Sequence, residues 1–410
     1  MPQATDHVAH RCVSSRSFAK QRLFATLFLA LAPLLFASSD GGAQVRAGKA
    51  EAPAIVAVAP MAVQAAVVPQ ATAATPGSTG TPASGTAQVV VASASSPAIT
   101  PVSPAWTDTL NKIVPDPPPP HLVRGTHYVI SNEDRHDLWL KTVQGKGGAY
   151  LGVGTDQNYV LAGWQKPELM VLFDFDQVVV NLHYVYRVFF ISAGTIDEFK
   201  SLWEVKNEAT AMKLLTDAYP HPKQRAAVVE AYKMSRGSVL ARFRKVLGIY
   251  KVHNIRCFLD DQSQYDHLAQ LFRTGRVVMV RGDLTVGGSL SSIASALQGI
   301  GVKLSVLYLS NAERYWTYTD GFRKSITALP FGDDATVIRT RARPNGVYMY
   351  VVQDAKNFLE WVRHPKVNTV YQVTHNMDPD PNPGLYYIRK SPAIAVPSVP
   401  HPPFAHLKAN

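Results

Sequence analysis

Cysteine is scarce in this chain, which has only two among 410 residues. Cys12 precedes a hydrophobic segment, so removal of that segment as an export signal would leave Cys257 alone. A disulfide within the processed chain is then excluded, and stability must come from a buried core rather than from covalent links. Cys257 lies in an apolar run, where we expect a buried thiol rather than a nucleophile.

Charge of either sign is missing from residues 52–107, which consist almost wholly of Ala, Val, Pro, Ser, Thr, Gly and Gln. Repeated prolines interrupt helices there, and the small side chains bury too little area to offset the entropy of the chain. We therefore interpret residues 44–120 as a disordered linker, which ends in the four consecutive prolines 117–120. Such a run forms a stiff extended spacer.

Dense blocks of Lys and Arg are also missing, although the formal net charge is +11. This balance favours anionic ligands or envelope surfaces. However, no basic run with interleaved aromatic residues indicates a nucleic-acid groove. We therefore expect a small-molecule or envelope ligand and no nucleic-acid partner.

A hydrophobic segment is present near the N-terminus. Three basic residues precede an uncharged run over 23–39, whose apolar part is too short to span a bilayer comfortably. Small residues follow, so cleavage could come after Ser39 or Ala43. We assign residues 1–43 as a signal peptide, or as a signal anchor if uncleaved, and expect membrane contact only through that uncleaved segment. The segment predicts an exported protein that is periplasmic, in the cell envelope or secreted.

From residue 121 onward, apolar runs alternate with helical patterns. Strands are predicted at 128–130, 149–153, 169–173, 276–281, 304–309, 336–341 and 347–352. A helical insertion is expected at about 195–250, after the strand at 169–173. The alternation predicts an α/β fold over 121–375, with a doubly wound, mostly parallel sheet and helices on both faces. Residues 376–410 are interpreted as a Pro-rich tail.

Polar residues follow four of the predicted strands. They are found at 152–156, 174–176, 282–283 and 310–311. Because the carboxyl ends of parallel strands meet at one edge of a sheet, we expect these clusters to lie together at a ligand site.

The first of these clusters begins a recognisable arrangement. A strand, the turn from Gly152 to Gly154, a helix, a second strand and the acid Asp174 about twenty residues after the turn form the pattern that cradles an adenosyl group. This arrangement resembles the fold of S-adenosylmethionine-dependent methyltransferases. Residues 128–133 and 152–159 also resemble an uncharacterised family of exported bacterial proteins with such a Rossmann-like domain.

The resemblance implies S-adenosylmethionine as a cofactor and assigns residues to its parts. Gly152 and Gly154 would line the methionine part. Asp174 or Asp176 would accept hydrogen bonds from the ribose hydroxyl groups, and Asp283 would approach the adenine.

Further residues would surround the cofactor and the acceptor of the methyl group. Glu133, Ser310 and Asn311 would face the substrate. Two positions depart from the methyltransferase pattern. Tyr150 stands where an acid usually precedes the first glycine. Asp156 stands where a third glycine is common, and it would lie beside the carboxylate of the cofactor.

Three alternatives stay open. Gly152 and Gly154 could serve only as a tight strand-to-helix turn. Asp174 and Asp176 could hold Mg²⁺ or Mn²⁺, as in a divalent-metal-dependent phosphatase or glycosyltransferase. The domain could also be a non-catalytic envelope binding module on a degenerate methyltransferase-like scaffold. His183 is more simply explained as a buried histidine with satisfied hydrogen bonds than as part of a site.

Overall fold

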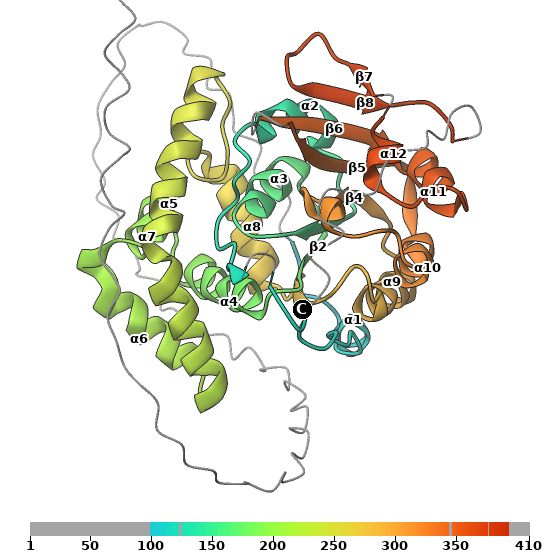
Figure 1. Cartoon of the computed structure of the whole chain (residues 1–410). Helices are drawn as coiled ribbons and strands as arrows, with labels where there is room; N and C mark the ends of the chain where they lie inside the picture. Colours follow the sequence, from blue (N-terminus) through green and yellow to red (C-terminus); the bar gives the residue numbers. More distant parts are fainter. Residues whose placement is uncertain (1–98, 123–124, 344–346, 376, 393–410) are drawn as a thin grey trace, which may run out of the picture. The chain divides into compact units, whose positions relative to one another are not determined.

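The computed structural model describes residues 99–122, 125–343, 347–375 and 377–392 (Figure 1). The predicted export segment and most of the predicted linker lie outside these residues. Within the described ranges, no helix combines the length and the apolar character that a bilayer crossing requires.

A single eight-stranded sheet organises the described part, in the order β3-β2-β1-β4-β5-β6-β8-β7. Its strands are β1 Ala149–Val153, β2 Leu169–Asp174, β3 Val277–Arg281, β4 Leu304–Tyr308, β5 Phe331–Ala342, β6 Tyr348–Asp354, β7 Asp378–Pro379 and β8 Leu385–Ile388. The first five strands in the order are parallel, and β6 is antiparallel to β5. The predicted α/β fold with a mostly parallel sheet is confirmed. The order reverses between β1 and β4, where open α/β sheets form a crevice.

The central strands are buried on both faces. On β1, Tyr150 enters one apolar cluster and Leu151 the other. Met170 and Val171 divide in the same way on β2. This is the reason for the continuous apolar runs of these strands, because side chains of alternate residues point to opposite faces and both faces are covered.

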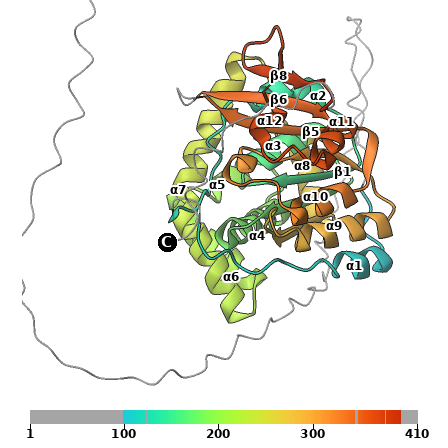
Figure 2. The same cartoon turned by 45° about the vertical axis from the view of Figure 1, so that its right-hand side comes forward.

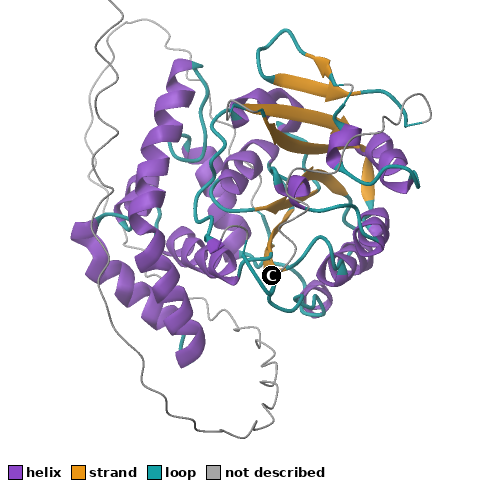
Figure 3. Ribbon diagram, viewed as in Figure 1, coloured by secondary structure: helices purple, strands orange, loops and turns teal. Residues whose placement is uncertain are grey.

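Helices cover the two faces of the sheet (Figures 1 and 3). On one face lie α2 Leu140–Val143, α3 Gln157–Gln165, α4 Gln177–Ser192, α5 Ile196–Ser201, α6 Glu208–Ala218, α7 Pro222–Val252 and α8 Gln262–Arg273. On the other lie α1 Pro104–Leu110, α9 Gly288–Gly299, α10 Asp320–Ala328 and α11 Ala355–Arg363. The short helices η2 His136–Trp139, η3 Val205–Asn207, η4 Ala312–Tyr315 and α12 Val370–Val373 complete the set.

The helical insertion expected at about 195–250 contains α5, α6 and α7, between β2 and β3. A capping box begins α5: the Thr195 side chain accepts a hydrogen bond from the Glu198 amide, and the Glu198 side chain accepts one from the Thr195 amide. Pro222 begins α7, where the missing N–H of proline costs nothing.

Three segments differ from the sequence prediction. Residues 128–130 form no strand and pair with no strand of the described part; Val129 and Ile130 pack against the core. The predicted linker contains helix α1, which Ser103 caps and whose Trp106 packs against the core. The predicted tail contributes β8, which pairs with β6 and extends the sheet to Ile388.

Candidate functional site

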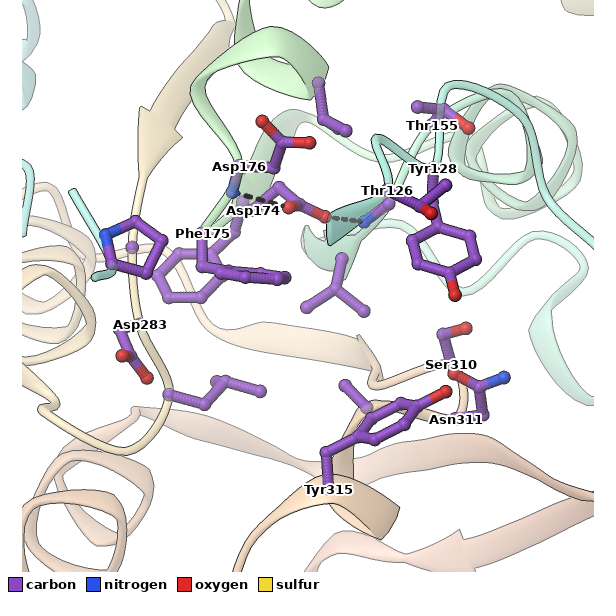
Figure 4. A pocket seen from close by; sticks show the side chains of 18 of the residues that line it. Thr126, Tyr128, Thr155, Asp174, Phe175, Asp176, Asp283, Ser310, Asn311 and Tyr315 are labelled. Atoms are coloured by element: carbon purple, nitrogen blue, oxygen red, sulfur yellow. Dashed lines mark hydrogen bonds between the residues drawn. The ribbon is translucent and has the colours of Figure 1, made fainter. Parts of the chain in front are cut away.

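A cavity of about 330 Å³ lies at the carboxyl ends of β1, β2, β3 and β4 (Figure 4). Its lining includes Gly154 after β1, Asp174 at the end of β2, Asp283 after β3, and Ser310 and Asn311 after β4. The expectation that four polar clusters meet at one edge of the sheet is confirmed. Figure 4 shows Asp174 and Asp176 at one end of the pocket and Ser310 and Asn311 at the other.

The turn after β1 is held from two sides. Gly154 has φ +86°, a conformation that favours glycine, and a Cβ there would lie 2.2 Å from Nε2 of Gln157. Its amide donates to Asp174 Oδ2 at 3.1 Å, and its carbonyl accepts from His183 Nε2 at 2.8 Å. The hydroxyl of Tyr159 donates to His183 Nδ1 at 2.7 Å. Both backbone polar groups of Gly154 are therefore engaged by side chains of the protein.

His183 fixes this turn as a neutral imidazole. Burial lowers its pKa to about 4, although the hydrogen bond to the Gly154 carbonyl opposes the shift. The interpretation of His183 as a buried histidine with satisfied hydrogen bonds is confirmed. The residue does not line the cavity but holds the Gly154 turn through the Gly154 carbonyl.

Asp174 is the cavity acid whose pKa is shifted most clearly. Burial raises its pKa to about 7, and the negative charge of Asp176 adds to the shift. Hydrogen bonds from the amides of Gly154 and Asp176 act in the opposite direction. Near neutral pH this carboxyl group therefore gains or loses its proton when the surroundings change slightly.

Asp176 serves the protein structure with both of its oxygens. Oδ1 accepts from the amide of Val178 at 2.9 Å and caps α4, while Oδ2 lies 2.8 Å from Nδ1 of His127. Asp174 likewise uses one oxygen for each of two amides. Across the described residues, no group of three His, Cys, Asp or Glu side chains could hold a metal ion. For the metal alternative, the two carboxylates already contact other groups of the protein, and no third His, Cys, Asp or Glu side chain joins them among the described residues.

Two residues of the predicted cofactor site do not line the cavity. A Cβ on Gly152 would lie 2.1 Å from Oδ1 of Asn158, so this glycine permits close packing of β1 against α3. Asp156 is buried, with Oδ2 at 2.9 Å from Nε of Arg242 and Oδ1 accepting from the Ser131 amide at 2.7 Å. Its charge is neutralised by an arginine on α7, and it does not face a ligand.

The loop after β3 is held by a residue that the sequence analysis placed in the linker. Asp116 is buried and accepts hydrogen bonds from the Asp283 amide at 2.9 Å and from the Ser289 hydroxyl at 2.6 Å. Asp283 itself accepts from the amide and hydroxyl of Thr285. Asp283 lines the cavity as predicted. The role of Asp116 was missed, because an isolated acid before a proline run gives no local signal.

Glu133 lies behind the cavity rather than in it. It is fully buried and accepts hydrogen bonds from Tyr308 at 2.5 Å, Ser310 at 2.6 Å and Thr340 at 2.5 Å. Burial alone would raise its pKa, but donors that include His136 at 3.2 Å lower the pKa below its ordinary value. Glu133 is therefore an ionised group that positions Ser310, and it does not face a substrate as the sequence suggested.

Aromatic side chains form much of the remaining wall. Tyr128, Phe175, Tyr315 and Trp316 line the cavity. Figure 4 shows Tyr128 and Tyr315 near Ser310 and Asn311, and Phe175 near Asp174. The amide of Asn311 donates to the Tyr348 hydroxyl at 3.0 Å. Such surfaces suit a flat ring, because aromatic groups pack against one another over a large apolar area.

The charge of the cavity is negative or neutral. Its carboxyl and imidazole groups in the described part are those of Asp174, Asp176, Asp283 and His121, and the described lining has no Lys or Arg. The amide of Gly154 is also occupied by Asp174. Cationic side chains, which usually hold phosphate groups, are thus missing from the described lining, and the amide of the glycine turn is already engaged.

Comparison with known protein families places most of this structure in a defined domain. A family model described as "Domain of unknown function (DUF7790)" matches residues 128–384, which is more than half of the chain. The matched range runs from Tyr128 in the cavity wall to Gly384, the residue before β8. It leaves out Asp116 and α1. No curated protein matches the chain.

Proposed function

The chain belongs to the DUF7790 family, and we propose that its domain binds a nucleoside-type small molecule, with S-adenosylmethionine as the leading candidate. One observation carries the proposal. The turn at Gly154 and the acid Asp174, twenty residues apart, line the same cavity where the strand order reverses. This arrangement supports a methyltransferase-like scaffold, in which such an acid accepts hydrogen bonds from ribose hydroxyls.

The charge of the cavity favours this ligand over phosphorylated nucleotides. ATP or a dinucleotide would bring several negative charges beside three carboxyl groups, without a cationic side chain among the described lining residues. S-adenosylmethionine has the same two ribose hydroxyls as ATP but carries a positive sulfonium group in place of the phosphates. Attraction between the sulfonium and the ionised form of Asp174 or Asp283 would add to the hydrogen bonds of the ribose.

The size and the walls of the cavity support the same class of ligand. Its volume of about 330 Å³ lies at the lower end of the range of small-molecule sites. The aromatic residues at the Ser310 end offer flat apolar surfaces for a purine or for an acceptor group. Together these features describe a site with carboxyl groups at one end and the tyrosines Tyr128 and Tyr315 at the other.

Titration calorimetry of the full chain with S-adenosylmethionine, S-adenosylhomocysteine and ATP tests the proposal. We expect saturable heat with the first two ligands and none with ATP. Asp174→Asn removes a charge-assisted hydrogen bond that is worth about 1.5–3 kcal/mol, so affinity falls roughly tenfold to a hundredfold. Asp333→Asn, on a fully exposed side chain, is the matched control. No heat with S-adenosylmethionine at millimolar concentration would refute the proposal.

A second candidate function is binding without catalysis. The acid expected at the acceptor end, Glu133, is fully buried and already accepts hydrogen bonds from four side chains. It cannot also take a proton from a substrate. Binding of S-adenosylmethionine with no formation of S-adenosylhomocysteine in the presence of cell-envelope extract would favour this binding module over a methyltransferase.

We also propose that the protein is exported, which rests on the hydrophobic run 23–39 and the basic residues before it. Fusion of residues 1–120 to a reporter enzyme that is active only outside the cytoplasm tests this. Activity is expected with the native segment. Substitution of two leucines in the run by arginine should abolish it.

A further inference from the structure

Helix α7 carries a large excess of positive charge. It contains eight Lys and Arg residues and a single acid, Glu230. Arg236, Arg242 and Lys245 form ion pairs with carboxylates of neighbouring segments. The other five form no ion pair with any described residue: Lys223, Arg225, Lys233, Arg244 and Lys251.

Three of these unpaired cations lie in one line on the solvent side. Exposed residues spaced by three or four positions share one face of a helix. We define the outer strip of α7 as six such residues: Lys233, Gly237, Ala241, Arg244, Gly248 and Lys251. From Lys233 to Lys251 the strip covers 18 residue steps, or about 27 Å. Figures 1 and 2 both show α7 at the periphery of the described part, with the sheet on its other side.

The two glycines of the strip have no internal packing role. A Cβ on Gly237 or Gly248 would meet no atom within 4 Å. By contrast, a Cβ on Gly287 would lie 2.5 Å from a backbone carbonyl oxygen. Glycine inside a helix is destabilising relative to alanine. No close packing within the described structure therefore explains why glycine, which destabilises the helix, stands at these two positions. The small side chains of the strip leave open space between its cations.

We propose that the outer strip of α7 docks the domain onto the anionic headgroups of a membrane surface. Because nothing bulky stands between Lys233, Arg244 and Lys251, all three can reach a flat surface at once. Met234 and Val252, which are 46% and 81% exposed, lie beside the strip and can contact the interface. Juxtamembrane cations are attracted to anionic lipid in this way.

The sequence before the described residues favours a membrane surface over other binding partners of the strip. In the signal-anchor alternative, the hydrophobic run 23–39 stays in the chain, and with the uncharged residues that follow it would bring the domain close to a bilayer. The strip has no aromatic residue on which nucleic-acid bases would stack. A second copy of the strip would place cations against cations. The proposed contact is separate from the N-terminal segment and from the ligand cavity.

Amine acylation of the full chain, read residue by residue by mass spectrometry, tests the proposal. Vesicles of phosphatidylglycerol should slow the modification of Lys233 and Lys251 at least fivefold, and vesicles of phosphatidylcholine should not. The exposed residues Lys112, Lys324 and Lys366 should react equally in both, and 0.5 M salt should remove the protection. Equal protection at all five lysines, or protection by polyglutamate but not by vesicles, would overturn the proposal.

A variant pair on the same helix gives an independent test. Arg244→Gln removes the central cation of the strip and leaves both reporter lysines in place. We expect the phosphatidylglycerol concentration for half protection to rise about fivefold, as for one juxtamembrane charge. Arg225→Gln removes the same charge from another side of α7 and should leave this concentration unchanged. Equal effects of the two variants would show a response to net charge and refute a specific strip.

Discussion

The buried ion pair between Arg242 and Asp156 offers the most direct test of how the site is held. Both residues are 3% exposed, and Nε of Arg242 lies 2.9 Å from Oδ2 of Asp156. Arg242→Met would leave the Asp156 carboxylate buried with an uncompensated charge. Removal of one partner of a buried pair costs about 3–5 kcal/mol of unfolding free energy. The same change would loosen the turn that contains Gly154.

Urea unfolding, followed by circular dichroism, measures this loss. The control is Lys213→Met, which breaks the pair between Lys213 and Asp217, separated by 2.6 Å but with side chains 76% and 59% exposed. Exposed pairs of this kind contribute less than about 1 kcal/mol, because water screens them. If Arg242→Met costs no more than Lys213→Met, burial does not decide the strength of these pairs and the reasoning is wrong.

The double variant separates the charge from the packing. Asp156→Asn together with Arg242→Met removes both charges, so the combined loss should be smaller than the sum of the two single losses. Simple addition of the two losses would mean that the residues act independently, in conflict with the 2.9 Å contact.

Further predictions concern pH and the helices. Because the pKa of Asp174 is raised to about 7, affinity for a ligand that needs the carboxylate should fall about tenfold per unit as pH decreases below 7, and titration calorimetry of Asp174→Asn should show no such dependence. Since the pKa of His183 is lowered to about 4, its imidazole NMR signals should not shift between pH 8 and pH 6. Gly237→Ala and Gly248→Ala should each raise the unfolding free energy by about 1 kcal/mol, whereas Gly287→Ala should lower it.

Local patterns predicted the elements with strong periodic or turn signals. The apolar runs of β1, β2 and β4 and the long helical stretch before residue 250 all appear where expected. The tripeptide 128–130 and the short run Leu385–Ile388 were misjudged. A run of three or four residues becomes a strand only when another strand lies beside it, and that depends on the tertiary structure.

The cavity was predictable because it follows from topology. Parallel strands place Gly154, Asp174, Asp283 and Ser310 at one edge of the sheet, whatever conformation the loops adopt. The direction in which each acid points was not predictable. Asp156 stands two residues from Gly154 and yet turns to Arg242.

The sequence by itself determined that a large α/β domain follows a long low-complexity segment. The uncharged stretch indicated the segment, the alternation of strands and helices indicated the fold, and the scarcity of cysteine indicated a core without disulfides. These features are local, and they act through chain entropy and hydrophobic burial. Only the tertiary structure decided that Asp116 docks this segment on the loop after β3 and that Arg242 neutralises Asp156. These contacts join residues 86 and 167 positions apart. No local pattern encodes them, because hydrogen bonds and ion pairs depend on distance in space.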